Sequence, residues 1–225
     1  MSQDIIKLFE KEGGEFISPP SVFIDKLKNI KAVLFDWDGV FNDGFKNAGD
    51  GSIFSEVDAM GTNLLRYALW RIHGKIPVSA VMTGENNPAA VHLARRESFH
   101  VVYSKIRDKA SMFKSFCETY KLRPSEVLFF FDDVLDLEVA RQCGVRIMIG
   151  RRSNVMLREF AGKSGFADYI TKNDGGYHGV REGAELSIGL LGQFDEVVNN
   201  RMVFSQNYQN YLADRRKVEL IHNEI

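Results

Sequence analysis

The residues with the clearest chemical potential are two aspartates separated by a single residue. Asp36 directly follows the apolar run 32–35, and Asp38 directly precedes Gly39. A short apolar run that ends in polar and glycine residues is typical of a buried strand in a parallel sheet, where ligands bind beyond the carboxyl ends of the strands. One carboxylate is suited to act as a nucleophile or metal ligand and the other as an acid or base. A solvated turn is the alternative for this motif taken alone.

A second acidic motif, FFFDDVLD, repeats this arrangement. The apolar run 127–131 predicts a buried strand that ends in Asp132 and Asp133, with Asp136 three residues further on. Together with the first pair, these carboxylates predict a densely anionic site that needs a cation to neutralise it. Hard oxygen ligands with room for a substrate phosphate favour Mg²⁺. Capping of a helix by Asp132 or Asp133 is the alternative that this motif leaves open.

Three further residues are candidates to contact a phosphoryl group. Thr83 and Gly84 follow the predicted strand 77–82, and a hydroxyl with backbone N–H groups at such a turn can hold phosphate oxygens. Lys109 lies in the first turn of a predicted helix, where the helix dipole disfavours a cation, so it is a candidate to neutralise a phosphoryl group. An ordinary turn at Thr83 and a solvated basic patch around Lys109 are the alternatives.

The elements that must position these residues alternate between strands and helices. Strands are predicted over 32–35, 77–82, 100–103, 127–131, 145–149 and 167–170. Helices are predicted over 64–72, 88–97, 108–120, 135–143, 154–162 and 179–191. This alternation predicts an α/β fold with a doubly wound parallel sheet and a Rossmann-like core.

The remaining segments are predicted to be accessory parts. Residues 1–30 read as an extension docked on the core, with a turn before the first core strand. Asp50 and Gly51 lie between apolar residues and predict the turn of a small β-hairpin placed as a flap over the site. We therefore expect a core over 31–191 without a large cap domain, and a C-terminal tail over 192–225 that contains a helix packed on a neighbour.

The composition is that of an ordinary globular protein. The 225 residues are 44% hydrophobic and 26% charged, which allows a sizeable core in one domain. The net charge of −1 gives no electrostatic basis for binding nucleic acid or an anionic membrane. Cys117 and Cys143 predict neither a disulfide framework nor a metal cluster, and they suit a reducing cytoplasm. We see no signal-peptide pattern and no run long enough to cross a bilayer.

Taken in order, the motifs read Asp-x-Asp-Gly, Thr-Gly, Lys and Asp-Asp-x-x-Asp, each at a strand end or a helix start. This order resembles the haloacid dehalogenase (HAD) superfamily of phosphatases over roughly residues 31–190. Within it, the chain looks like the capless branch of 3-deoxy-manno-octulosonate 8-phosphate (KDO 8-phosphate) phosphatases and related nonulosonate 9-phosphate phosphatases. The closer resemblance is carried by FDWDGVFNDG, the glycine-rich segment that follows it, 54–61 and GGYHGVREGAEL.

The resemblance implies a Mg²⁺-dependent phosphatase acting on a small phosphorylated sugar or sugar acid. Asp36 would attack phosphorus and form an aspartyl-phosphate, which splits the hydrolysis into two easier steps. Asp38 would protonate the leaving alcohol and then activate the hydrolytic water. Asp36, Asp132 and the main-chain carbonyl of Asp38 would bind Mg²⁺. The branch also implies a homotetramer in which hairpins pack together and a neighbour's tail or loop completes the substrate site.

The other implied roles concern the phosphoryl group, the substrate and the surroundings of the metal. Thr83, Gly84 and Lys109 would hold the transferring phosphoryl group, where stabilisation of charge dominates catalysis. Asp58 and Arg181 would contact the substrate. Asp133 and Asp136 would orient the metal ligands and the lysine.

Three positions depart from the pattern of the family. Val57 replaces a substrate-binding arginine, Glu85 replaces the arginine after Thr-Gly, and Phe131 replaces a glycine, where we expect it to crowd the backbone near the metal. Arg181 remains to supply a cation, with a role on a helix surface as its alternative. Glu85 and Phe131 leave open a catalytically weak scaffold or regulatory subunit, and a phosphotransferase that uses the same aspartyl-phosphate is a second alternative. The absence of a cap that excludes water counts against the phosphotransferase.

Overall fold

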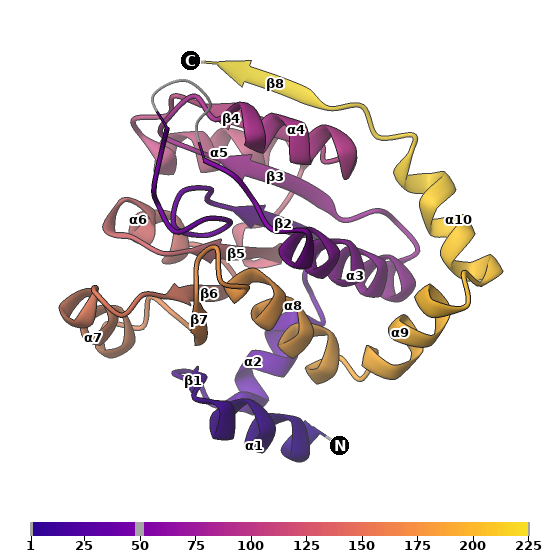
Figure 1. The fold of residues 1–225 in the computed structure, drawn as a ribbon, viewed down its shortest axis with the longest axis horizontal. Helices are drawn as coiled ribbons and strands as arrows, with labels where there is room; N and C mark the ends of the chain where they lie inside the picture. Colours follow the sequence, from indigo (N-terminus) through magenta and orange to yellow (C-terminus); the bar gives the residue numbers. More distant parts are fainter. Residues whose placement is uncertain (1, 48–51, 225) are drawn as a thin grey trace.

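A computed structural model describes residues 2–47 and 52–224 and shows one eight-stranded sheet with helices on both faces (Figure 1). The strand order is β1-β7-β6-β5-β2-β3-β4-β8, and every neighbouring pair is parallel except β1 with β7. The strands are β1 (Glu15–Phe16), β2 (Ala32–Phe35), β3 (Val78–Met82), β4 (Val101–Ser104), β5 (Val127–Phe131), β6 (Val145–Gly150), β7 (Tyr169–Asp174) and β8 (Ile221–Glu224). The α/β fold predicted from the sequence is confirmed.

The helices cover the two faces of the sheet unequally. They are α1 (Ser2–Glu12), α2 (Pro20–Leu27), α3 (Glu56–His73), α4 (Pro88–Arg96), α5 (Lys109–Tyr120), α6 (Leu137–Ala140), α7 (Val155–Lys163), α8 (Gly179–Leu190), α9 (Phe194–Met202) and α10 (Gln206–Arg215). Side chains alternate along β2, so that Val33 and Phe35 enter a core shared with α2, α3, α4 and α8. Ala32 and Leu34 enter a second core with α5, α6 and α7. The central strand is therefore buried on both faces.

The connection order places the carboxyl ends of β2 and β5 side by side. From β2 the chain builds β3 and β4 on one side, and it then crosses back to place β5 on the other side of β2. Phe35 lies opposite Phe130 in the parallel register, and their rings stack with centroids 5.0 Å apart. Such a reversal of strand order is where open α/β sheets bind ligands.

The N-terminal residues dock on the sheet through a buried carboxylate. Asp168 is fully buried and accepts hydrogen bonds from Ser18 Oγ (2.5 Å), Lys26 Nζ (2.7 Å) and Arg146 Nη2 (2.7 Å). Burial alone would raise the pKa of Asp168, but these donors lower it.

The turn predicted before the first core strand is wrong in one respect. Pro20 begins helix α2, where the fixed φ of proline is favourable.

The C-terminal residues fold back on their own chain. Tyr208 and Tyr211 of α10 are buried against α3, where their hydroxyls donate to the side chain and the carbonyl of Asn63. Strand β8 then joins the edge of the sheet beside β4 (Figure 1). The expected helix is thus two helices, and the edge strand was not predicted, because its side chains are all exposed and carry no apolar pattern.

Two predicted helices have different bounds in the structure. Only Leu137–Ala140 of the helix predicted over 135–143 is α-helical, after a 3₁₀ turn over Val134–Asp136. Helix α3 begins earlier than predicted, because Ser55 caps it by accepting from the N–H of Val57. The predicted hairpin turn at Asp50 and Gly51 lies outside the described residues. Of the residues that flank it, Asn47 forms an isolated β-bridge, while 45–46 and 52–55 form no strand in the part that the structure describes. In the same described part, no helix is long and apolar enough to cross a membrane.

Replacing Asp168 tests how strongly the N-terminal segment is held. We expect Asp168→Asn to lower the free energy of unfolding by about 3 kcal/mol, because it leaves the partly buried cations Lys26 and Arg146 without their counter-charge. Urea unfolding measures this change. Asp25→Asn on the exposed side of α2 is the control and should leave the stability nearly unchanged. Equal stability of the two variants would contradict this role for Asp168.

His100 predicts a pH dependence of stability. Burial, with a smaller contribution from the charge of Arg66, lowers the pKa of His100 from 6.5 to about 4, and its Nδ1 accepts from the N–H of Ser79. The unfolded chain therefore binds this proton more readily, so the contribution to stability is complete above pH 6.5 and is lost as the pH falls toward about 4. Unfolding at several pH values should show a shallower slope in His100→Gln. An unchanged slope would contradict this assignment.

Candidate active site

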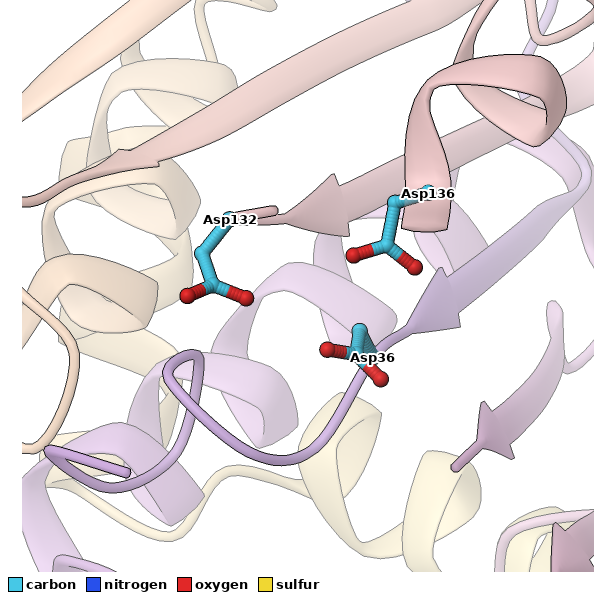
Figure 2. A group of neighbouring side chains, drawn as sticks. All are labelled: Asp36, Asp132 and Asp136. Carbon is cyan, nitrogen blue, oxygen red and sulfur yellow. The ribbon is translucent and has the colours of Figure 1, made fainter. Parts of the chain in front are cut away.

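Three buried carboxylates meet at the ends of β2 and β5. Asp36 follows β2, Asp132 follows β5, and Asp136 ends the 3₁₀ turn after β5, and Figure 2 shows their carboxylates converging on one space. One oxygen from each lies within 4.8 Å of the other two. The local sequence explains the position of Asp136, because Asp133 accepts from the N–H of Val134 (2.7 Å) and so caps the turn.

Lys109 lies between two of these carboxylates. It is the first residue of α5, a helix capped by Asp108 through the N–H of Ser111. Its Nζ lies 2.6 Å from Oδ1 of Asp36 and 2.7 Å from Oδ1 of Asp136. Burial alone would lower the pKa of Lys109, but the two carboxylates raise it overall, so the lysine stays cationic. The helix start predicted from the sequence therefore delivers a buried positive charge to the site.

The carboxylate oxygens of the cluster are suited to bind a divalent cation. Burial first, and then repulsion by Asp36, raises the pKa values of Asp132 and Asp136 above their usual range. Oδ1 of Asp132 is buried without a hydrogen-bond partner among the described residues, while its Oδ2 is paired with Arg151 at 3.0 Å. An all-oxygen set with excess negative charge and an unsatisfied buried oxygen is suited to a hard cation. The residues present thus fit a metal.

Asp38 lies in a separate hydrogen-bond network beside the cluster. Its carboxylate accepts from Ser52 Oγ (2.8 Å) and Asn87 Nδ2 (2.9 Å), and its Oδ2 is paired with Lys46 Nζ at 2.8 Å. Asn87 also donates to Oγ1 of Thr83 at 2.8 Å. The fully buried Asn87 therefore links the Asp38 carboxylate to the Thr83 hydroxyl.

Two predicted substrate-binding residues are engaged elsewhere. Asp58 is fully buried, and its Oδ1 accepts from the N–H of Arg181 at the start of α8. The guanidinium of Arg181 pairs with Glu185 at 2.6 Å and lines a cavity of about 850 Å³ between α1, α8 and α9. Among the described residues, neither Asp58 nor Arg181 has a hydrogen bond or ion pair with the three carboxylates of the buried cluster. Their role in substrate binding stays a prediction.

The other predicted positions have different surroundings. Gly84 and Glu85 are exposed next to Thr83, and the N–H of Glu85 donates to its hydroxyl at 3.4 Å. Val57 is 41% exposed on α3. Phe131 is buried in the second core, where its ring stacks on Phe129 with centroids 5.5 Å apart. The phenyl ring thus occupies the core below the site.

Four residues near the carboxylates were missed by the sequence analysis: Lys46, Ser52, Asn87 and Arg151. Arg151 follows β6 directly, so the rule that ligand-binding residues lie beyond strand ends would have found it. The other three lie in irregular segments, where residue type alone gives no signal.

Neutralising Asp132 tests the electrostatic cost of the cluster. In metal-free buffer at neutral pH, we expect Asp132→Asn to raise the melting temperature, because folding raises the pKa of Asp132 and such an acid destabilises the fold at any pH above its unfolded pKa of about 3.8. Added divalent cation should stabilise the unmodified protein and not this variant. Asp133→Asn, at an exposed neighbour that retains its capping oxygen, is the control for thermal unfolding. An equal cation effect in all three proteins would contradict a metal site here.

Comparisons with known proteins agree with this geometry. No protein-family model matches the sequence. KdsC of Escherichia coli (strain K12), a 3-deoxy-D-manno-octulosonate 8-phosphate phosphatase, is 26% identical to the chain over 177 residues, which are 77% of this chain and 87% of that protein. The enzyme of the same name from Yersinia pestis is 26% identical over 167 residues, or 72% of this chain and 82% of that protein.

Solved structures show the same fold. A HAD superfamily (subfamily III A) hydrolase from Legionella pneumophila superposes with a TM-score of 0.67 at 25% identity, over 81% of this chain and 94% of that chain. A 3-deoxy-D-manno-octulosonate 8-phosphate phosphatase from Moraxella catarrhalis, solved with a magnesium ion, a phosphate ion and KDO, has a TM-score of 0.65 at 23% identity over 79% and 97% of the two chains. The resemblance inferred from the motifs is confirmed, because the chain is similar in sequence to KdsC phosphatases and in fold to a HAD superfamily hydrolase, and these similarities support a phosphatase.

Proposed function

We propose that this protein is a Mg²⁺-dependent phosphatase that hydrolyses a small phosphorylated sugar or sugar acid, similar to KDO 8-phosphate or a nonulosonate 9-phosphate, through an aspartyl-phosphate on Asp36. The observation that carries the proposal is the contact between Asp36 and Lys109 within the buried carboxylate cluster, with Asp38 two residues away in a separate network. This arrangement separates a nucleophile from an acid and base.

In the first step of the proposed reaction, Asp36 is the nucleophile. Its carboxylate attacks phosphorus, and the bond between phosphorus and the leaving oxygen breaks, which leaves the phosphoryl group on Asp36. Lys109 and the Thr83 hydroxyl, which is held by Asn87, are the candidate donors to the phosphoryl oxygens. Loss of one such donor typically lowers the rate by about 10²–10³.

Asp38 is the acid in the first step of the proposed reaction and the base in the second. A protonated Asp38 donates its proton to the leaving alcohol, and the resulting carboxylate then accepts a proton from the water that hydrolyses the aspartyl-phosphate. Ser52 and Asn87 hold opposite oxygens of this carboxylate at 2.8 and 2.9 Å and so restrict its rotation. This fixed orientation supports its use in both steps.

Asp36 and Asp132, together with the main-chain carbonyl of Asp38, are the proposed Mg²⁺ ligands. When bound, Mg²⁺ would neutralise charge on the carboxylates and the phosphoryl group. The related enzyme from Moraxella catarrhalis was solved with a magnesium ion, which supports this choice of metal. Asp136 is proposed to hold Lys109, and Asp133 to hold the turn that carries Asp136.

The remaining parts of the proposal concern assembly and location. We propose that residues 31–191 form the catalytic unit, that 1–30 and 192–225 are accessory, and that the subunits form a homotetramer. Phe45 and Ile53 beside the site are each 81% exposed, which suits burial against another subunit. Cys117 and Cys143 are free and buried, in keeping with a reducing cytoplasm. A weakly catalytic scaffold and a phosphotransferase remain as outcomes of the test that follows.

Phosphate release from a panel of sugar and sugar-acid phosphates, with Mg²⁺ or with a chelator, tests the proposed reaction. We expect turnover to require Mg²⁺, to fall on the order of 10²–10⁴-fold in Asp38→Asn, and to be abolished in Asp36→Asn. Asp25→Asn, on an exposed face of α2, is the matched control. Turnover retained in Asp36→Asn would contradict the mechanism. No turnover by the folded protein would favour the scaffold, and phosphoryl transfer to an added alcohol in place of water would favour the phosphotransferase.

A further inference from the structure

We propose that Arg151 and Lys46 form an anion subsite on the leaving-group side of the catalytic carboxylates. This subsite would bind the carboxylate of a sugar-acid phosphate and so select it over a neutral sugar phosphate. The inference rests on the proposed function, and it names the substrate class within it. Arg181, the cation that the sequence analysis considered for this purpose, is paired with Glu185 instead.

Arg151 is held across a loop that only glycine permits. Its Nη2 pairs with Oδ2 of Asp132 at 3.0 Å, and its side chain remains 27% exposed. Gly39 has a φ of +85°, and a Cβ there would lie 2.3 Å from Nη2 of Arg151 and 2.0 Å from Oδ2 of Asp132. Gly44, also at +85°, would place a Cβ 3.3 Å from Nη1. The loop therefore wraps closely around the guanidinium and fixes its position.

Arg151 retains donors for a second partner. A guanidinium has five N–H donors in a planar fork, which matches a carboxylate. Within residues 2–47 and 52–224, Asp132 is the one ion-pair partner of this group. Its exposed edge is thus free to donate to a ligand anion while Asp132 is still held.

Lys46 supplies a second cation close to the same loop. Its Nζ lies 2.8 Å from Oδ2 of Asp38, and its side chain is 35% exposed. Because Asp38 is the proposed proton donor to the leaving oxygen, a cation paired with Asp38 lies near the leaving group and not at the phosphoryl end. Lys109 is already bound by Asp36 and Asp136, whereas among the described residues Lys46 and Arg151 are cations paired with Asp38 and Asp132 that are still partly exposed to a charge on the sugar.

A pair of substrates that differ only in charge tests the subsite. KDO 8-phosphate carries the carboxylate, and its C1 amide replaces that group with a neutral one of similar size. Loss of Arg151 also removes the partner of Asp132 and so lowers turnover of both substrates, but we expect Arg151→Met to lower kcat/KM for the acid roughly 10- to 100-fold more than for the amide, as for loss of a hydrogen bond to a charged group. Lys46→Met should act in the same direction, and it serves if Arg151→Met folds poorly. Arg152→Met, at the exposed neighbouring arginine, is the control.

Calorimetry with KDO, which lacks the phosphate, provides a readout that does not depend on turnover. We expect the unmodified protein to bind KDO and the Arg151→Met and Lys46→Met variants to bind it at least tenfold more weakly. Equal losses of kcat/KM for the acid and the amide would overturn the inference, because they would show that Arg151 only holds Asp132. Unchanged KDO binding in both variants would also overturn it. Failure of the unmodified protein to hydrolyse either phosphate would instead refute the proposed function, and KDO binding would then decide the subsite alone.

Discussion

The ion pairs of Lys109 with Asp36 and Asp136 are the interaction on which the site depends. Three carboxylates are buried within a few ångströms of one another, an arrangement that folding strongly penalises unless opposite charges compensate it. Lys109 supplies one compensating charge from α5 and Arg151 another from the end of β6. Burial, followed by the excess negative charge that remains, raises the pKa values of Asp132 and Asp136, and this charge suits the cluster to a divalent cation.

The sheet holds these charged side chains close together. Its two central strands, β2 and β5, are buried on both faces, so the residues after their ends start from a rigid base. The edges of the sheet are extended by β1 and β8, which come from segments outside the predicted core. The buried Asp168 and the tyrosines of α10 hold these segments in place. These contacts thus stabilise the fold far from the site, whereas the buried carboxylates of the site destabilise it.

The sequence was most informative where apolar runs end in charged residues. The runs before Asp36 and Asp132 predicted two neighbouring strand ends, and α/β alternation predicted the sheet that joins them. The same logic could not find Ser52 or Asn87, because their positions depend on how irregular segments fold over Asp38. Strand β8 was missed because its side chains are exposed and carry no apolar pattern, and the short α6 was missed because a cap at Asp133 begins a 3₁₀ turn. Arg181 was placed by family pattern, whereas its guanidinium pairs with Glu185.

The central claim is that Asp36 is a nucleophile assisted by a cation at the carboxylate cluster. Beryllofluoride forms a complex with aspartate that imitates an aspartyl-phosphate, and ¹⁹F NMR can detect it without any knowledge of the substrate. This account predicts a bound fluorine signal that appears only with Mg²⁺ and is absent in Asp36→Asn, while the Asp25→Asn protein behaves like the unmodified one. A signal that persists in Asp36→Asn, or no signal from the folded protein in the presence of Mg²⁺, would contradict it.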